Sequence, residues 1–126
     1  MKIYLASPLF TLAEKKQIEY WAQKFREFGD EVYVPMEHQI LNAYEIPNHE
    51  WAKKVFEADI KALKECDKVV CIYYGLYSDS GTAWECGFAY GIGKPVEIID
   101  YSGKEMSLMV VQGSEIPNRF KNKYQT

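Results

Sequence analysis

The apolar run at residues 68–74, Lys-Val-Val-Cys-Ile-Tyr-Tyr, constrains the fold of this chain more than any other feature. After its first residue the run shows no polar and apolar alternation, which is typical of a strand buried on both faces of a sheet. Such strands belong to parallel sheets that helices cover on both sides, so the run predicts an α/β protein. Three further β-rich runs accompany it, at Lys2–Ala6, Glu31–Val34 and Pro95–Ile99.

Helical segments are predicted between these strands. Thr11 and Glu14 have capping-box spacing and Gly29 follows the periodic stretch, so a helix is expected over Thr11–Phe28. Further helices are expected from Asn48 to about Lys64, at Thr82–Ile92 and at Glu105–Gln112, with a long loop at Met36–Pro47. The core-facing residues of the first helix are expected to be Ile18, Trp21, Ala22, Phe25 and Phe28.

Strands that alternate with helices build βα units, and a length of 126 residues is that of one domain. We therefore expect residues 1–126 to form a single α/β domain. Its sheet is predicted to be mostly parallel, with about five strands flanked by helices in a flavodoxin-like or Rossmann-like doubly wound arrangement. Ligands of such sheets bind beyond the carboxyl ends of the strands, so functional residues are expected to follow the strands.

Charge and cysteine content exclude several classes of function. The net charge is −3, and the cationic footprint that a nucleic-acid polymer requires is missing. No apolar run approaches the ~18 residues of a membrane span and no signal peptide is expected before the first strand, so a cytoplasmic protein is predicted. Three cysteines without C-x-x-C spacing and two histidines favour neither a disulfide framework nor a metal site.

Asp59 is the one charge that the second predicted helix places among apolar side chains. Burying a carboxylate is costly unless it is hydrogen-bonded or neutralised. Asp59 is therefore either a site residue or an acceptor for backbone N–H groups of a loop. On a helical wheel of ~100° per residue, the apolar sector around it comprises Trp51, Ala52, Val55, Phe56, Ala58, Ile60, Ala62 and Leu63.

Glu85 is the second carboxylate in an unfavourable place. Apart from Cys86 and Tyr90, it is the only ionisable side chain of the predicted helix Thr82–Ile92. That helix is apolar around most of its circumference, as a buried helix is. Glu85 lies in its first turn, where the macrodipole favours a negative charge. Stabilising a helix end does not require this degree of burial, so a functional role is favoured.

Other chemical motifs are missing. Gly87, Gly91 and Gly93 follow a helix rather than a strand, so there is no dinucleotide fingerprint, and no P-loop is present. Two histidines give no support for a Ser-His-Asp triad. Enzymes that break glycosidic bonds use two carboxyl groups beside the bond, one as acid and one as nucleophile or base. Asp79, before the third helix, is either its N-cap or a ligand for sugar hydroxyls.

The stretch Asp-x-Gly-x-x-x-Glu-x-Gly at residues 79–87 is the most specific motif of the chain. With several weaker stretches, in order and over roughly Lys2 to Gly113, it resembles the nucleoside 2-deoxyribosyltransferase family. The other matching stretches are Lys2–Pro8, Val34–Gln39, Trp51 with Phe56–Asp59, Gly93–Val96 and Leu108-Met109.

The resemblance implies transfer of a 2-deoxyribosyl group between purine or pyrimidine bases, without a metal or organic cofactor. Glu85 is then the nucleophile that forms a covalent deoxyribosyl-enzyme, Asp59 exchanges a proton with the base, and Tyr4 orients Glu85. A homo-oligomer, dimer or hexamer, with shared active sites is implied, and the partners are a 2′-deoxyribonucleoside and a free nucleobase. The implied substrate contacts are Asp79 to the sugar, Gln39 to the base, and Ser107 and Met109 from a neighbouring subunit.

Two features bear on the choice between nucleosides and nucleotides. Ser107 stands where family members often carry Asn, and with Ser7 it would suit the 5′-phosphate that related N-glycosidases bind. Asp79 stands where those hydrolases have a neutral serine, and its carboxylate would repel a phosphate of about −2 charge. Asp79 therefore favours nucleosides. Hydrolysis of deoxynucleosides or their 5′-monophosphates is the alternative to transfer, and two buried acids argue against a non-catalytic nucleotide-binding module.

Overall fold

The computed structural model describes residues 1–38, 48–75, 79–102 and 106–115. Its sheet has four parallel strands in the order β2-β1-β3-β4, which is the order of a doubly wound flavodoxin-like fold. The predicted α/β class and parallel sheet are confirmed, with four strands among the described residues rather than about five. Beyond β4 the described chain adds one parallel bridge, between Glu97 and Glu115. The strands are β1 (Lys2–Ala6), β2 (Glu31–Tyr33), β3 (Lys68–Tyr73) and β4 (Val96–Asp100).

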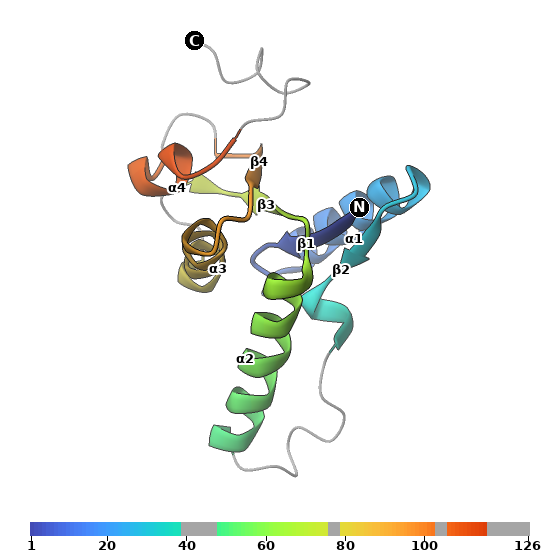
Figure 1. Ribbon diagram of the computed structural model, residues 1–126. Helices are drawn as coiled ribbons and strands as arrows, with labels where there is room; N and C mark the ends of the chain where they lie inside the picture. The colour runs from blue at the N-terminus through green and yellow to red at the C-terminus, as the bar shows by residue number, and fades with distance from the viewer. Residues whose placement is uncertain (39–47, 76–78, 103–105, 116–126) are drawn as a thin grey trace.

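Helices cover both faces of this sheet (Figure 1). Helix α1 packs on one face, where Ile18, Ala22 and Phe25 join the inward side chains of Ile3 and Leu5 in one apolar cluster. Helices α2, α3 and α4 pack on the opposite face, in the cluster that contains the side chains of Tyr4 and Ala6. The helices are α1 (Leu12–Glu27), the 3-10 helix η1 (Pro35–His38), α2 (Asn48–Glu65), α3 (Ser80–Gly91) and α4 (Leu108–Gln112).

Helix α1 begins with the capping box that its sequence predicts. Thr11 Oγ1 accepts from the Glu14 N–H at 3.1 Å, and Glu14 Oε1 accepts from the Thr11 N–H at 2.8 Å. The prediction that Phe28 faces the core is wrong, because its side chain is 76% exposed. Phe28 is the C-cap, and the chain turns away from the helix at Gly29, whose φ is +93°.

Helix α2 meets the sheet only with its carboxyl-terminal half. Leu63 is fully buried, whereas Trp51 is 40% and Phe56 is 53% exposed. Figure 1 shows the amino-terminal half of α2 extending away from the strands, which explains the difference. The apolar sector of α2 is therefore buried against the core only in its carboxyl-terminal half.

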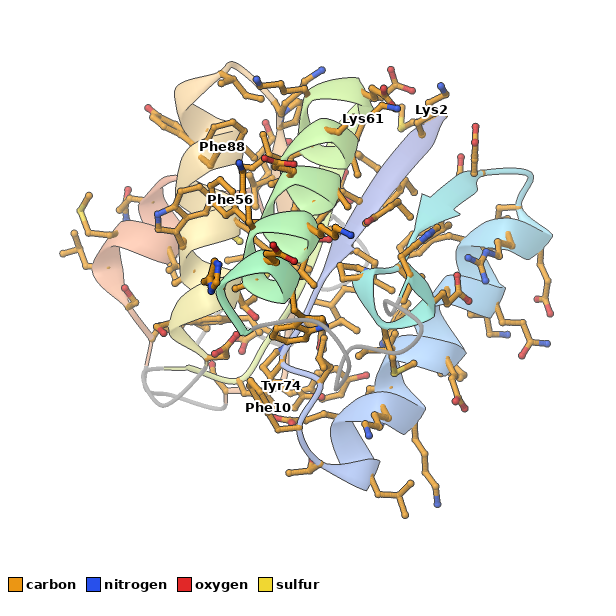
Figure 2. The ribbon with its side chains drawn as sticks, turned by 90° about the horizontal axis from the view of Figure 1, so that it is seen from below. Lys2, Phe10, Phe56, Lys61, Tyr74 and Phe88 are labelled. Carbon is orange, nitrogen blue, oxygen red and sulfur yellow. The ribbon has the colours of Figure 1, made fainter. Side chains whose placement is uncertain are left out.

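The sequence predicts that helix α3 is buried around most of its circumference. The structure instead buries it on one face. Thr82, Cys86 and Ala89 face the core, while Trp84 is 50% and Tyr90 is 66% exposed. The apolar outer residues continue those of α2, because Phe56 packs against Trp84 at 5.6 Å between ring centroids and Trp84 stacks on Phe88 at 5.5 Å. Figure 2 shows Phe56 and Phe88 on this part of the surface, away from Phe10 and Tyr74.

All three cysteines are buried and reduced. Cys71 on β3 and Cys86 on α3 lie in the same apolar cluster. The neighbouring Cys86 thiol, followed by burial, raises the pKa of the Cys71 thiol. The thiol pair therefore packs as a small apolar contact between the sheet and α3.

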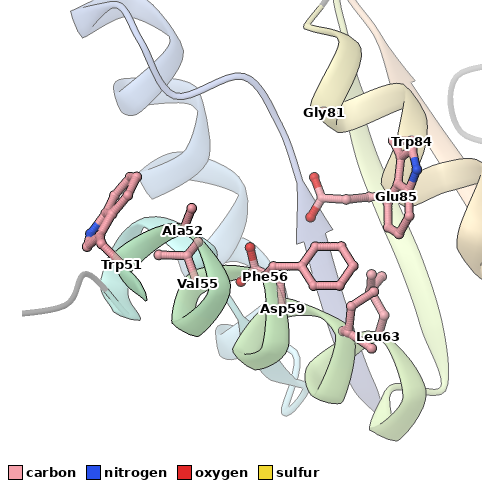
Figure 3. Close-up of a pocket in the computed structure, with 10 residues that line it drawn as sticks. Trp51, Ala52, Val55, Phe56, Asp59, Leu63, Gly81, Trp84 and Glu85 are labelled. Atoms are coloured by element: carbon pink, nitrogen blue, oxygen red, sulfur yellow. The ribbon is translucent and has the colours of Figure 1, made fainter. Parts of the chain in front are cut away.

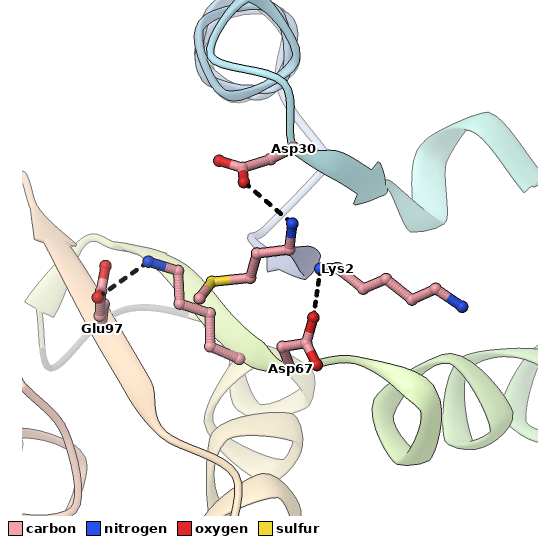
Figure 4. Close-up of polar contacts among 6 residues, drawn as sticks. Lys2, Asp30, Asp67 and Glu97 are labelled. Atoms are coloured by element: carbon pink, nitrogen blue, oxygen red, sulfur yellow. Dashed lines mark hydrogen bonds and ion pairs between the residues drawn. The ribbon is translucent and has the colours of Figure 1, made fainter.

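Polar contacts tie the amino-terminal ends of the strands together (Figure 4). The Met1 ammonium lies 3.5 Å from Asp30 just before β2, and the Lys2 N–H donates to Asp67 at 2.6 Å just before β3. The partly buried ion pair between Lys68 and Glu97 joins β3 to β4 at 3.0 Å. These contacts fasten one end of the sheet and leave the other end to the loops that follow the strands.

The α1 capping box yields a stability prediction. Thr11→Ala removes the hydroxyl that accepts from the Glu14 N–H, so the free energy of unfolding should fall by about 1 kcal/mol in urea titrations. Thr11→Ser keeps a hydroxyl at the same place and should retain most of that stability. Equal losses in the two variants would show that the cap contributes nothing.

Candidate active site

A cavity of about 480 Å³ lies between α2 and the beginning of α3 (Figure 3). Most of its wall is apolar, and Asp59 and Glu85 are the two carboxylates that line it. The structure thus brings the two carboxylates singled out in the sequence to one cavity. Its aromatic and aliphatic lining includes Trp51, Val55, Phe56 and Trp84.

Glu85 projects from α3 toward α2 and is largely buried (Figure 3). The hydroxyl of Tyr4 on β1 donates a hydrogen bond to its Oε2. Burial raises the pKa of Glu85 from an ordinary 4.5 to about 7, and the nearby carboxylates of Asp59 and Asp79 act in the same direction. The hydrogen bond from Tyr4 opposes these effects because it stabilises the ionised carboxylate. Near neutral pH, Glu85 is therefore present in both its ionised and its protonated form.

Tyr4 is fully buried at the centre of the sheet. Burial, followed by the negative charge of Glu85, raises the pKa of its phenol far above the usual value. The hydroxyl consequently keeps its proton and serves as a donor to Glu85. Its place on the inner strand β1 also fixes where the carboxylate of Glu85 comes to lie.

Asp59 is half-buried on α2, where the hydroxyl of Tyr33 donates to its Oδ1 at 3.1 Å. Burial raises the pKa of the Asp59 carboxyl, while the Tyr33 hydrogen bond and the nearby His38 lower it. Within the described part of the chain, no backbone N–H donates to Asp59. The alternative interpretation of Asp59 as an acceptor for a loop backbone therefore finds no support among these residues.

Asp79 is the N-cap of α3. Its Oδ2 accepts from the N–H of Thr82 at 3.1 Å and lies 3.3 Å from the Thr82 hydroxyl. A Cβ atom at Gly81 would stand 2.9 Å from that oxygen, so the absence of a side chain at Gly81 leaves space for the cap. The capping interpretation of Asp79 is thus observed. Its Oδ1 has no hydrogen-bond partner among the described residues, which leaves one oxygen for a ligand.

Among the predicted substrate contacts that the structure describes, this cavity is not lined by Asp79, Ser7, Ser107 or Met109 of the same chain. Ser7 is buried after β1, and its hydroxyl donates to the Pro8 carbonyl at 2.8 Å. Ser107 is the N-cap of α4, and Met109 on the same helix is 79% exposed. Both line a hollow between α3 and α4 instead. Gln39 lies outside the described residues.

Tyr33 and His38 are site residues that the sequence reasoning missed. Tyr33 stacks on Tyr4 at 5.4 Å between ring centroids, and His38 stacks on Tyr33 at 4.3 Å. In the parallel register Tyr33 is the direct partner of Tyr4, so the two side chains lie on the same face of the sheet. The local sequences around Tyr4 and Tyr33 do not specify which strands are neighbours, so this pairing could not be deduced from them.

The family model described as nucleoside 2-deoxyribosyltransferase matches residues 3–119 of the chain. The chain belongs to this family. A solved 2-deoxyribosyltransferase from the psychrotolerant bacterium Bacillus psychrosaccharolyticus is 32% identical, with a TM-score of 0.85 over 100% of this chain and 93% of that one. This family of pentosyltransferases acts on nucleosides and free nucleobases.

Two further solved structures are similar. A conserved protein from Enterococcus faecalis V583 is 27% identical, with a TM-score of 0.72 over 89% of this chain and 70% of that one. The CMP N-glycosidase BcmB from Clostridium botulinum is 22% identical, with a TM-score of 0.59 over 93% of this chain and 86% of that one, and shares the fold. No curated protein matches the chain significantly.

Neither a metal cluster nor a membrane-spanning helix is found in the described parts of the chain. There, no three side chains of His, Cys, Asp or Glu come together as ligands for a metal ion. No described helix combines the length and the apolar character needed to cross a bilayer.

The raised pKa of Glu85 predicts how stability depends on pH. Folding favours the protonated carboxyl of Glu85. The contribution of this group to the free energy of unfolding therefore falls as pH rises from 4.5 to about 7, with no further fall above. Glu85→Gln cannot titrate. We expect its free energy of unfolding, minus that of the wild type, to increase from pH 4.5 to 7.5 in urea titrations.

The exposed Glu19 of α1 provides the matched control, because Glu19→Gln makes the same chemical change on the surface. Its difference from the wild type should stay nearly constant over this pH range. A flat difference for Glu85→Gln as well would contradict the burial of Glu85.

Proposed function

We propose that this protein transfers the 2-deoxyribosyl group from a deoxynucleoside to a second base through a covalent deoxyribosyl intermediate on Glu85. The observation that carries the proposal is that Glu85, held by Tyr4, and Asp59 line one cavity with apolar walls. Family membership supports the same reaction class. Such base exchange belongs to nucleoside salvage.

Glu85 is the nucleophile in this proposal. Its ionised carboxylate attacks the anomeric carbon as the bond to the base breaks, and the sugar is stored as an acyl acetal. The second base then displaces Glu85, so one difficult substitution becomes two easier ones. Tyr4 supports this role because its hydrogen bond favours the ionised carboxylate and fixes one of its oxygens. A 2-deoxy sugar suits the mechanism, since no electron-withdrawing 2′-hydroxyl opposes the oxocarbenium-like transition state.

Asp59 is the proton donor and acceptor for the base. Burial raises the pKa of its carboxyl, which favours a carboxyl that carries a proton to the departing base and recovers one from the incoming base. The rings of Trp51, Phe56 and Trp84 offer the flat apolar surface that a base requires. Gln39 is proposed to contact the base as well.

Asp79 directs the site toward nucleosides. Its carboxylate is close enough to Glu85 to raise the pKa of that group, so a bound 5′-phosphate would face two negative charges. The Oδ1 of Asp79, which has no partner in the described residues, is proposed to accept from a sugar hydroxyl. Ser7 is proposed as a further contact near the sugar, at the end of β1.

We also propose a homo-oligomer, a dimer or hexamer, in which Ser107 and Met109 complete the site of a neighbouring subunit. Two observations support this arrangement: Met109 is exposed beside Leu108, which is 72% exposed, and neither lines the cavity of its own chain. The exposed apolar sides of α2 and α3 provide further surface for a neighbouring subunit. Light scattering after size exclusion will measure the number of subunits.

A base-exchange assay tests the reaction. Wild-type protein incubated with thymidine and adenine should form deoxyadenosine, and a 2-fluoro-2-deoxyribosyl nucleoside should leave an adduct on Glu85 detectable by mass spectrometry. Glu85→Gln should lose the adduct and lower the exchange rate by at least about a thousandfold, because no nucleophile remains. Glu57→Gln, a change on the exposed face of α2, is the matched control and should retain exchange.

The products distinguish transfer from its alternative. Free deoxyribose without deoxyadenosine would show that the protein hydrolyses the nucleoside through the same Glu85 and does not transfer the sugar. Intact nucleoside and no adduct would refute both reactions.

A second variant tests the discrimination against phosphate. Asp79→Ser keeps a good N-cap for α3 but removes the charge. We expect the ratio of kcat/KM for deoxyadenosine 5′-monophosphate to that for deoxyadenosine to rise about tenfold, equivalent to roughly 1.4 kcal/mol. An unchanged ratio would show that the Asp79 charge does not select the substrate.

A further inference from the structure

A second pair of tyrosine and carboxylate lies beside Tyr4 and Glu85. Tyr33 on β2 donates its hydroxyl to Oδ1 of Asp59 at 3.1 Å, just as Tyr4 on β1 donates to Glu85. The two tyrosines are direct partners in the parallel register, and their rings stack with an interplanar angle of 17°. Each carboxylate of the cavity is therefore held by its own phenol.

His38 completes a stack of three rings. Its imidazole lies 4.3 Å from the Tyr33 ring centroid, with an interplanar angle of 6°, on η1 directly after β2. Tyr33 is thus held between Tyr4 and His38. A ring confined on two sides loses rotational freedom, so its hydroxyl is directed at Asp59 before any ligand binds.

The Tyr33 hydrogen bond makes the two oxygens of Asp59 unequal. Burial and the charge of Asp59 raise the pKa of the Tyr33 phenol, so the phenol remains a donor. Oδ1 already accepts this proton, and a second proton there would weaken that bond. Oδ2 has no partner among the described residues, and Asp59 lines the cavity. When Asp59 is neutral, its own proton consequently belongs on Oδ2.

We infer that Tyr33 is a positioning residue that keeps the acid proton of Asp59 on Oδ2, where it meets the base. The inference rests on the proposed function. As Glu85 bonds to the anomeric carbon, the electron pair of the glycosidic bond goes to the base, and the base takes the proton from Oδ2. In the return step the incoming base gives a proton to Oδ2, its nitrogen bonds to the anomeric carbon, and the bond to Glu85 breaks.

The groups around Asp59 identify what else can shift its titration. Tyr33 faces it from β2, His38 from η1 and Glu85 from α3, with Tyr4 of β1 in contact with Glu85. Tyr33 and His38 lower the pKa of Asp59. Removing the Tyr33 hydroxyl alone should therefore raise the pKa of Asp59.

Two nucleosides with different proton requirements test the inference with Tyr33→Phe, which keeps the ring stack. Deoxyadenosine needs a proton on its departing base, whereas 7-methyl-2′-deoxyguanosine carries a positive charge and releases a neutral base without one. We expect kcat/KM for deoxyadenosine to fall at least about tenfold, with less than about a twofold change for the methylated nucleoside. The Asp59-dependent limb of the pH profile for deoxyadenosine should move to higher pH.

Tyr4→Phe is the matched comparator, because the nucleophile is needed for both nucleosides and both rates should fall. In Asp59→Asn, the added change Tyr33→Phe should have no further effect on deoxyadenosine. Equal losses with both nucleosides in Tyr33→Phe, or no loss with deoxyadenosine, would overturn the inference while leaving transfer intact.

Two further outcomes are also decisive. If Tyr33→Phe fails to fold, His38→Leu removes one ring of the stack, and its loss of activity must again be selective for deoxyadenosine. If the wild type turns over neither nucleoside and gives no adduct on Glu85, the proposed function fails and the inference falls with it.

Discussion

The pairing of β1 on both of its edges is the constraint on which the site depends. Tyr4 stands opposite Tyr33 on one side and Val69 on the other. Because side chains alternate between faces, a slip of one residue would turn Tyr4 away from Glu85 and disrupt the apolar clusters on both faces. The same hydrogen-bond ladder therefore stabilises the sheet and positions the phenols that hold Glu85 and Asp59.

Local sequence patterns were sufficient for the fold and for the two carboxylates. The apolar run of β3 indicates a sheet covered on both faces, and the isolation of Asp59 and Glu85 among apolar residues marks both as exceptions. Tyr33 carries no such local mark, because its role depends on which strand lies beside β1. For Asp79, the sequence left two interpretations open, and the structure shows the capping one while leaving an oxygen available.

The burial of α2 and α3 shows a different limit of sequence patterns. An apolar face identifies a surface that avoids water, but it does not say what covers that surface. Phe56 and Trp84 are both half-exposed, and both also line the cavity between their helices. Part of the apolar pattern that resembles a core sector is therefore the wall of this cavity, where the side chains stay partly exposed.

The buried thiol pair has a practical consequence. Cys71 on β3 is only 1% exposed and packs with Cys86 of α3, so a soluble alkylating reagent can reach it only when α3 separates from β3. The labelling rate of Cys71 consequently measures how often that opening occurs. This native thiol therefore reports whether the helix that bears Glu85 is packed on the sheet.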